Sequence, residues 1–128
     1  MIQGQSGANR MKDTDTTLAD LKELVKEFRD QRDWEQFHTP QNLSMSIAIE
    51  AAELMEEFQW LTPQESRQLQ EDEARLARLG EELADIIIYA LSFANSLNID
   101  IASAVRDKLA RNARKYPEDE YRGKFRKL

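Results

Sequence analysis

Hydrophobic residues recur along this chain at steps of three and four positions, which is the period of an amphipathic α-helix. The first such stretch begins at Leu18 and continues through Phe28, with Thr16 or Thr17 in position to cap it. The segment 34–40 breaks the pattern. No strand-like alternation of useful length appears, so the pattern predicts an all-α fold.

Two longer stretches carry more hydrophobic surface than a small monomer would cover. Asn42 offers an N-cap for a helix that runs from Leu43 to about Trp60 and is apolar around most of its girth. A second apolar run extends from Leu83 to Leu97. This surplus predicts a helical bundle that is completed by oligomerisation.

Capping signals delimit the remaining helices. Thr62 and Glu65 flank a proline in a capping-box pattern that starts a helix, which Gly80 could divide. Asp100 can cap a last helix over 101–115, and a proline follows it. We therefore expect about four main helices.

Length, charge and composition bound the possible partners. With 128 residues the chain fits one helical domain over 16–117. We expect a disordered, partly vector-derived leader at 1–15 and a basic tail at 118–128. The net charge of -6 gives no general attraction to a nucleic-acid polymer, there is no cysteine, and no apolar run reaches the roughly 20 residues of a membrane helix. We expect a cytoplasmic protein with neither a nucleic-acid polymer nor a membrane as partner.

Two acidic pairs lie in apolar surroundings. Glu50 and Glu53 stand three residues apart and share a helix face, and Glu82 and Asp85 repeat that spacing before three isoleucines. Because an unpaired buried carboxylate costs several kcal/mol, such groups are usually protonated, ion-paired or bound to a metal. We expect Asp85 to lie at the edge of the apolar interior. If both pairs face one space they form an all-oxygen site suited to Mg²⁺; alternatively, they are solvated acidic faces.

Other chemistries fit these residues less well. A di-iron bundle needs Glu-x-x-His motifs, and the one histidine, His38, lies in a predicted loop. A Ser-His-Asp hydrolase would require that same histidine to contact both a serine and a carboxylate from its position in the loop. Mg²⁺ is therefore the expected metal.

A polar stripe on the last predicted helix could bind phosphates. Lys108, Asn112 and Lys115 fall on one face at steps of three and four residues. Such stripes are also common as solvated faces, because the helix dipole favours cations near a C-terminus. Both interpretations remain open from spacing alone.

Three aromatic residues are candidates for stacking on a nucleotide base. Trp34 and Trp60 flank predicted helix ends, and Tyr89 lies one turn beyond Asp85 on the same face. A flat side chain offers a large stacking surface at little cost in entropy. Each could equally belong to the core or to a subunit interface.

The acidic pairs resemble the ExxE and ExxD signature of the all-α nucleoside triphosphate pyrophosphatases, the MazG-like superfamily. Further segments look like the dCTP pyrophosphatase branch of that superfamily, and together they cover most of the chain from Leu18 to Pro117. The matching segments are 32–38, 58–60, 85–89 and 108–117.

This resemblance implies a four-helix fold and cleavage of a nucleoside triphosphate to the monophosphate and pyrophosphate. The residues that it implies as catalytic groups and Mg²⁺ ligands are Glu50, Glu53, Glu82 and Asp85. It also implies a homodimer or homotetramer with sites shared between subunits. The span 54–81 is long for the family, which leaves the substrate open; we favour dCTP-like deoxynucleotides and a housecleaning role. The rival interpretation is a non-catalytic helical interaction module whose acidic faces bind a basic partner.

Overall fold

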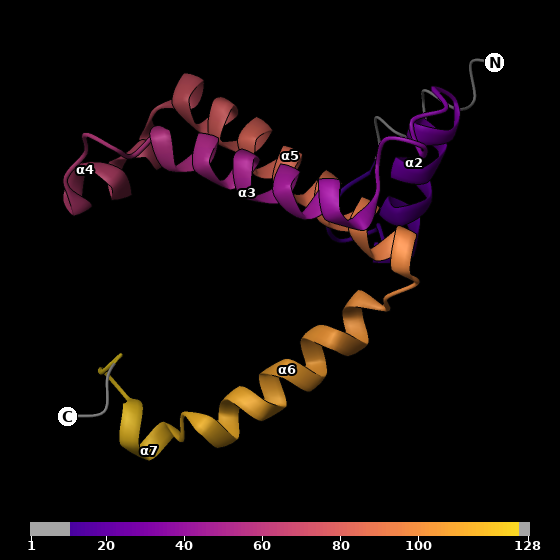
Figure 1. The fold of residues 1–128 in the computed structure, drawn as a ribbon. Coiled ribbons are helices and arrows are strands. Elements are labelled where there is room, and N and C mark those ends of the chain that lie inside the picture. The colour runs from indigo at the N-terminus through magenta and orange to yellow at the C-terminus, as the bar shows by residue number, and fades with distance from the viewer. Residues whose placement is uncertain (1–10, 126–128) are drawn as a thin grey trace. The chain divides into compact units, whose positions relative to one another are not determined.

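Every regular element among residues 11–125, the part of the chain that the computed structural model describes, is a helix (Figure 1). The predicted all-α class is confirmed. The chain divides into two compact units, Met1–Leu97 and Asn98–Leu128, which are described separately below. The first ten residues of the expected leader lie outside the described part.

Helix α2 (Leu18–Asp30) opens the first unit. The Thr17 hydroxyl accepts a hydrogen bond from the backbone N–H of Asp20, whose carboxylate accepts one from the backbone N–H of Thr17. This capping box satisfies two N–H groups that a helix start leaves unpaired. Of the two predicted capping residues, Thr17 is the one that caps the helix.

Helix α3 (Pro40–Glu56) begins three residues before its predicted start. Thr39 is its N-cap, because the Thr39 hydroxyl accepts from the backbone N–H of Asn42 at 3.2 Å. The prediction that Asn42 caps the helix is wrong; the Asn42 side chain donates to the carbonyl of Phe37 instead. Pro40 at the first helical position costs no intrahelical hydrogen bond, because the N–H that proline lacks would have had no partner within the helix. The helix gives way to turns after Glu56, before Trp60.

A short excursion separates α3 from the longest helix. It consists of α4 (Pro63–Gln68), which starts with the predicted capping box at Thr62 and Glu65, and a single 3₁₀ turn, η1 (Leu69–Glu71). Helix α5 (Glu73–Leu97) then runs without a break past Gly80. The division falls at Asp72, whose extended backbone ends η1 and whose carboxylate accepts from the N–H of Arg75.

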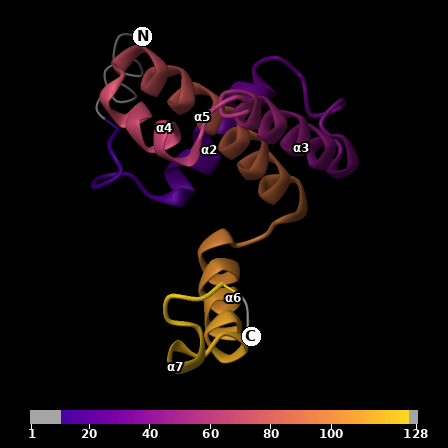
Figure 2. The same ribbon diagram turned by 90° about the vertical axis from the view of Figure 1, so that its left-hand side faces the viewer.

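The core of the first unit lies where α5 meets its neighbours. Helix α3 packs alongside α5, and α2 packs against α5 toward its C-terminal half (Figures 1 and 2). The buried hydrophobic side chains are Val25, Leu43, Leu69, Leu91 and Ala94. Through this packing, the acidic pair of α3 is brought next to that of α5.

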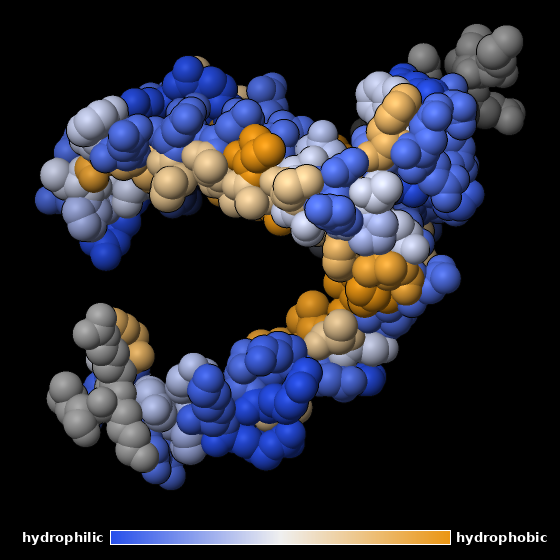
Figure 3. Space-filling view, viewed as in Figure 1, coloured by the Kyte–Doolittle hydropathy of each residue, from blue (hydrophilic) through white to orange (hydrophobic). Residues whose placement is uncertain are grey.

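Much hydrophobic surface remains exposed, as the sequence predicts. Apolar side chains reach the surface along α3, including Met45, Ile49 and Met55 (Figure 3). Between α2 and α5 an apolar hollow of about 430 Å³ opens, with Phe28 and Ile87 in its lining. A single first unit therefore leaves large apolar patches in contact with water.

The second unit consists of α6 (Ile101–Lys115) and the short α7 (Glu118–Tyr121). Asp100 caps α6 as predicted, by accepting from the backbone N–H of Ser103 at 3.0 Å. Helix α7 lies within the predicted basic tail, and its Tyr121 ring contacts that of Tyr116 edge-on. No single helix in 11–125 is long and apolar enough to cross a membrane, although α5 and α6 taken together reach that length and composition.

Candidate metal centre and nucleotide site

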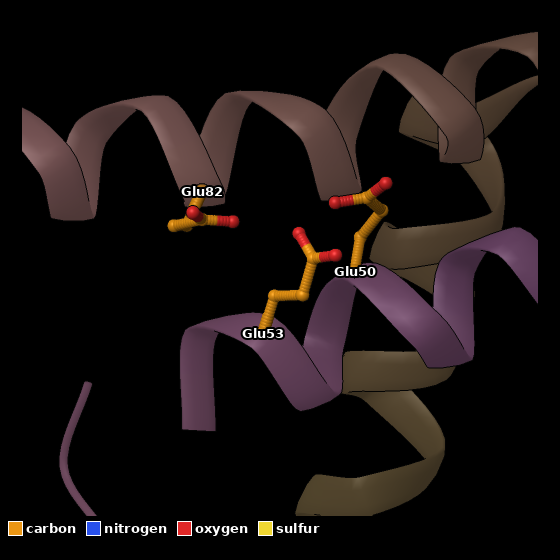
Figure 4. Close-up of side chains that lie close together, drawn as sticks. All are labelled: Glu50, Glu53 and Glu82. Carbon is orange, nitrogen blue, oxygen red and sulfur yellow. The ribbon is translucent and has the colours of Figure 1, made fainter. Parts of the chain in front are cut away.

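Three carboxylates converge between α3 and α5. Glu50 and Glu53 project from successive turns of α3, and Glu82 projects from α5 toward them (Figure 4). One carboxylate oxygen from each residue lies within 4.8 Å of the others. The three-residue spacing places both α3 glutamates on the face that packs along α5.

Burial and mutual repulsion disfavour the ionised form of these carboxylates. One oxygen of Glu50 and one of Glu82 are buried without a hydrogen-bond partner among residues 11–125. Burial is the main cause that raises the pKa of Glu50, followed by a hydrogen bond with Glu53 and its charge. The pKa of Glu82 is raised likewise, by burial first and then by the charges of Glu53 and Asp85. A bound cation would relieve both costs at once.

The donor set fits a hard divalent cation. All three groups offer carboxylate oxygens, which Mg²⁺ and Ca²⁺ prefer, and no nitrogen or sulfur ligand takes part. The unpartnered oxygens of Glu50 and Glu82 are the ones that the packing hides from water. Mg²⁺ keeps several waters and adds phosphate oxygens, so three protein carboxylates leave it room for a substrate.

Asp85 completes the acidic group at a greater distance. Its charge helps to raise the pKa of both Glu50 and Glu82, so it faces the same space. It is exposed, however, and does not belong to the group within 4.8 Å. Its expected place at the edge of the apolar interior is wrong for this chain alone, because Ile87 and Ile88, which follow it on α5, are themselves 43% and 42% exposed.

A row of aromatic rings lies in the same unit. The ring of Trp34 contacts those of Phe28 and His38 at centroid distances of 5.7 and 5.8 Å. His38 in turn meets Tyr89 of α5 at 6.2 Å. Two of the three predicted stacking residues, Trp34 and Tyr89, are thus joined through His38. The Trp34 ring is still 40% exposed and can accept a further stacking partner.

A specific helix ending places Trp34. Asp33 has a left-handed backbone with φ 51°, the N–H of Trp34 donates to the carbonyl of Arg29, and that of Asp33 donates to Asp30. These two bonds form a Schellman motif, which usually includes a hydrophobic contact across the turn. The edge-on contact between Trp34 and Phe28 supplies it.

The other predicted binding residues lie elsewhere. Trp60 follows α3 and is 86% exposed, so its indole is free to contact a ligand or another subunit. Lys108, Asn112 and Lys115 share α6 in the second unit, where both lysines are exposed and Asn112 is half-buried. Within the first unit, the structure brings the three glutamates together in one group and joins Trp34, His38 and Tyr89 in one row.

Two polar residues of this region escaped the sequence analysis. His38 was assigned to a loop and given no role, yet its ring is half-buried between Trp34 and Tyr89. Arg29 is buried in α2 with only 4% of its surface exposed. The signal for Arg29 was present, because it lies four residues after Val25 on the apolar face of α2.

Comparison with known proteins agrees with this geometry. A model of the MazG-like family matches residues 45–127, which include both acidic pairs and the polar stripe of α6. The chain belongs to the MazG-like family. This MazG-like chain is 40% identical over 110 residues to dCTP pyrophosphatase 1 of Bos taurus and 40% identical over 111 residues to that of Homo sapiens. The alignments cover 86% and 87% of this chain and 65% of each relative, so the chain spans just under two thirds of the length of the curated relatives it matches.

A solved structure resembles most of this chain. The crystal structure of a pyrophosphatase from Archaeoglobus fulgidus superposes with a TM-score of 0.73 at 38% sequence identity. The match covers 84% of this chain and 99% of that chain. The fold of this MazG-like chain is therefore shared with a pyrophosphatase.

Proposed function

We propose that this chain is a Mg²⁺-dependent nucleoside triphosphate pyrophosphohydrolase that releases a monophosphate and pyrophosphate. The observation that carries the proposal is the convergence of Glu50, Glu53 and Glu82, with two of their oxygens buried and unpartnered. The names of its relatives, dCTP pyrophosphatase 1 and a pyrophosphatase, support the same reaction.

The carboxylates have separable tasks in this reaction. When bound, Mg²⁺ neutralises phosphate charge and lowers the pKa of an attacking water. Glu50, Glu53 and Glu82 would hold the cation, with Asp85 beside them. Glu53 is the exposed member of the three-glutamate group. It accepts a proton from the attacking water while the water oxygen forms a bond to the α-phosphorus. The bond from that phosphorus to the bridging oxygen breaks, and its electron pair leaves with pyrophosphate.

The remaining predicted residues bind the nucleotide. Lys108 and Lys115 of α6 are proposed to stabilise the departing pyrophosphate, with Asn112 between them on the same stripe. Trp34 and Tyr89 supply stacking surfaces for the base. We further propose dCTP-like deoxynucleotides as the preferred substrates, in line with the two mammalian relatives, and a cytoplasmic housecleaning role.

We also propose that the working form is a homodimer or homotetramer. The exposed apolar side chains of α3, the hollow between α2 and α5 and the almost fully exposed Trp60 support it, since such patches in a monomer usually mark an interface. A second copy would cover them, and the exposed Trp60 would then reach a neighbouring site.

A product analysis tests the proposed reaction. The purified protein is incubated with a panel of ribo- and deoxyribonucleoside triphosphates, with Mg²⁺ and with EDTA, and the products are separated by chromatography. Monophosphate and pyrophosphate that form only with Mg²⁺, fastest from dCTP, are the expected result. Diphosphate with orthophosphate would contradict attack at the α-phosphorus. No turnover of any nucleotide would favour the interaction-module interpretation.

A further inference from the structure

Arg29 is a buried cation that forms no ion pair within the described part of the chain. Its side chain is 4% exposed, and no carboxylate oxygen of residues 11–125 lies within 4.0 Å of it. Its Nε has no hydrogen-bond partner in that part of the chain. Because a buried unpaired charge destabilises a fold, an apolar residue would suit this position better if packing were its only task.

Arg29 joins the turn that carries Trp34 to helix α5. Its carbonyl accepts the N–H groups of Arg32 and Trp34, both at 3.1 Å. Its guanidinium makes a long contact of 3.5 Å to the carbonyl of Ser92, which lies within one turn of Tyr89 on α5. One residue therefore touches both sides of the aromatic row.

The charge of Arg29 also acts on His38. Burial is the main cause that lowers the pKa of His38, and the positive charge of Arg29 lowers it further. The titratable groups that face the ring are Arg29 from α2 and the phenol of Tyr89 from α5. The Nδ1 atom of His38 is buried and has no hydrogen-bond partner in the part of the chain that the structure describes, and a nearby cation favours a lone pair there over an N–H. Both effects favour the neutral form of the ring.

We propose that Arg29 is a positioning residue of the nucleotide site, which holds the Trp34–His38 turn against α5 and keeps the His38 ring uncharged between Trp34 and Tyr89. A neutral ring packs between two aromatic rings without the desolvation cost of an imidazolium. Arg29 acts on the base-stacking surface and leaves the carboxylate chemistry alone. The kinetic consequence rests on the proposed function, whereas the charge state of His38 does not.

The charge state can be measured directly, because His38 is the one histidine of the chain. Its ring signals are followed by NMR as a function of pH in the wild type, Arg29→Met, Arg29→Gln and Arg29→Lys. The neutral variants should raise the pKa of His38, and the lysine variant should keep it low. Arg29→Gln keeps a donor for the Ser92 carbonyl and serves as the test if Arg29→Met fails to fold.

Lys26→Met is the matched control, because it removes an exposed cation from the same helix, where Lys26 forms an ion pair with Asp30. It should leave the His38 titration at the wild-type value. An unchanged titration in both neutral Arg29 variants, or an equal rise in the Lys26 variant, would overturn the electrostatic part of the proposal.

Steady-state kinetics test the positioning role. Both neutral variants should raise KM for the preferred nucleotide about tenfold, equivalent to about 1.4 kcal/mol, with kcat within about twofold of the wild type. They should also move the acid limb of the kcat/KM profile to higher pH, and Arg29→Lys should restore part of the loss. Unchanged KM and pH profile in variants that turn over nucleotide would refute the role. An inactive wild type would refute the proposed function instead, with the NMR result standing by itself.

Discussion

The acidic cluster predicts opposite effects of one substitution on the metal-free and the metal-bound protein. Burial and the neighbouring carboxylates raise the pKa of Glu50, so the folded state disfavours its ionised form. The stability contributed by protonated Glu50 is present below its ordinary pKa and is lost as the pH rises through the raised value. At neutral pH, Glu50→Gln removes the cost of the buried, ionised carboxylate. The metal-free variant should therefore unfold at a higher temperature than the metal-free wild type.

Mg²⁺ should reverse that order. At a free concentration one hundred times its dissociation constant, a ligand stabilises the folded state by about 2.7 kcal/mol, which corresponds to roughly 10 °C in Tm for a domain of this size. Glu50 is one of three carboxylates within 4.8 Å, and its loss should weaken binding at least about 100-fold. At the same Mg²⁺ concentration the variant would then gain only about 0.4 kcal/mol, or roughly 2 °C.

Thermal unfolding followed by circular dichroism, in EDTA and in Mg²⁺, measures both effects. Glu27→Gln is the matched control, because it removes an exposed carboxylate of α2 far along the chain from the cluster. The Glu27→Gln variant should show the same rise in Tm with Mg²⁺ as the wild type. The reasoning would be refuted if Mg²⁺ did not raise the Tm of the wild type. It would also be refuted if Glu50→Gln kept the full rise in Tm with Mg²⁺ and were less stable than the wild type without metal.

Three further predictions concern catalysis, packing and pH. Glu53→Gln should lower kcat by about 10²–10⁴ with helicity unchanged, as expected for the loss of a general base, and full activity would remove Glu53 from that role. Leu43, which is 1% exposed, should cost about 2–5 kcal/mol on substitution by alanine, measured by urea unfolding; a cost near zero would show that α3 does not pack as described. Because the pKa of His38 is lowered by burial and by Arg29, its neutral form stabilises the fold above the ordinary histidine pKa, and this contribution is lost as the pH falls through the lowered value. His38→Gln should therefore lose less stability on acidification than the wild type, and an equal loss would contradict the assignment.

Local sequence signals predicted most of the helices. Thr17, Thr62 and Asp100 cap helices as predicted, because a cap depends on a side chain and an N–H three residues away. The same local chemistry explains one error, since Thr39 and Asn42 both suit an N-cap, and Pro40 at the first helical position was the signal that favoured Thr39. Gly80 was a plausible break, but α5 runs through it, with the Arg78–Glu57 ion pair on one side of it and the approach of Glu82 to the α3 glutamates on the other.

The site was only partly predictable. Spacing alone placed Glu50 and Glu53 on one face, and it gave each helix an acidic pair. Glu82 lies close to these two glutamates, whereas Asp85 stays exposed. This difference depends on how α3 and α5 are rotated about their own axes, which the sequence of a single helix does not reveal. The meeting of His38 with Tyr89 and of Arg29 with Ser92 joins residues more than fifty positions apart, beyond the reach of local periodicity.

The central claim is that this chain directs water to the α-phosphorus of a nucleoside triphosphate at a metal site built from α3 and α5. Hydrolysis of dCTP in water labelled with heavy oxygen, with Mg²⁺ present, tests it most directly when both products are analysed by mass spectrometry. The account predicts one labelled oxygen in dCMP and none in pyrophosphate, with no product in EDTA. Label in pyrophosphate, or equal turnover without metal, would contradict it.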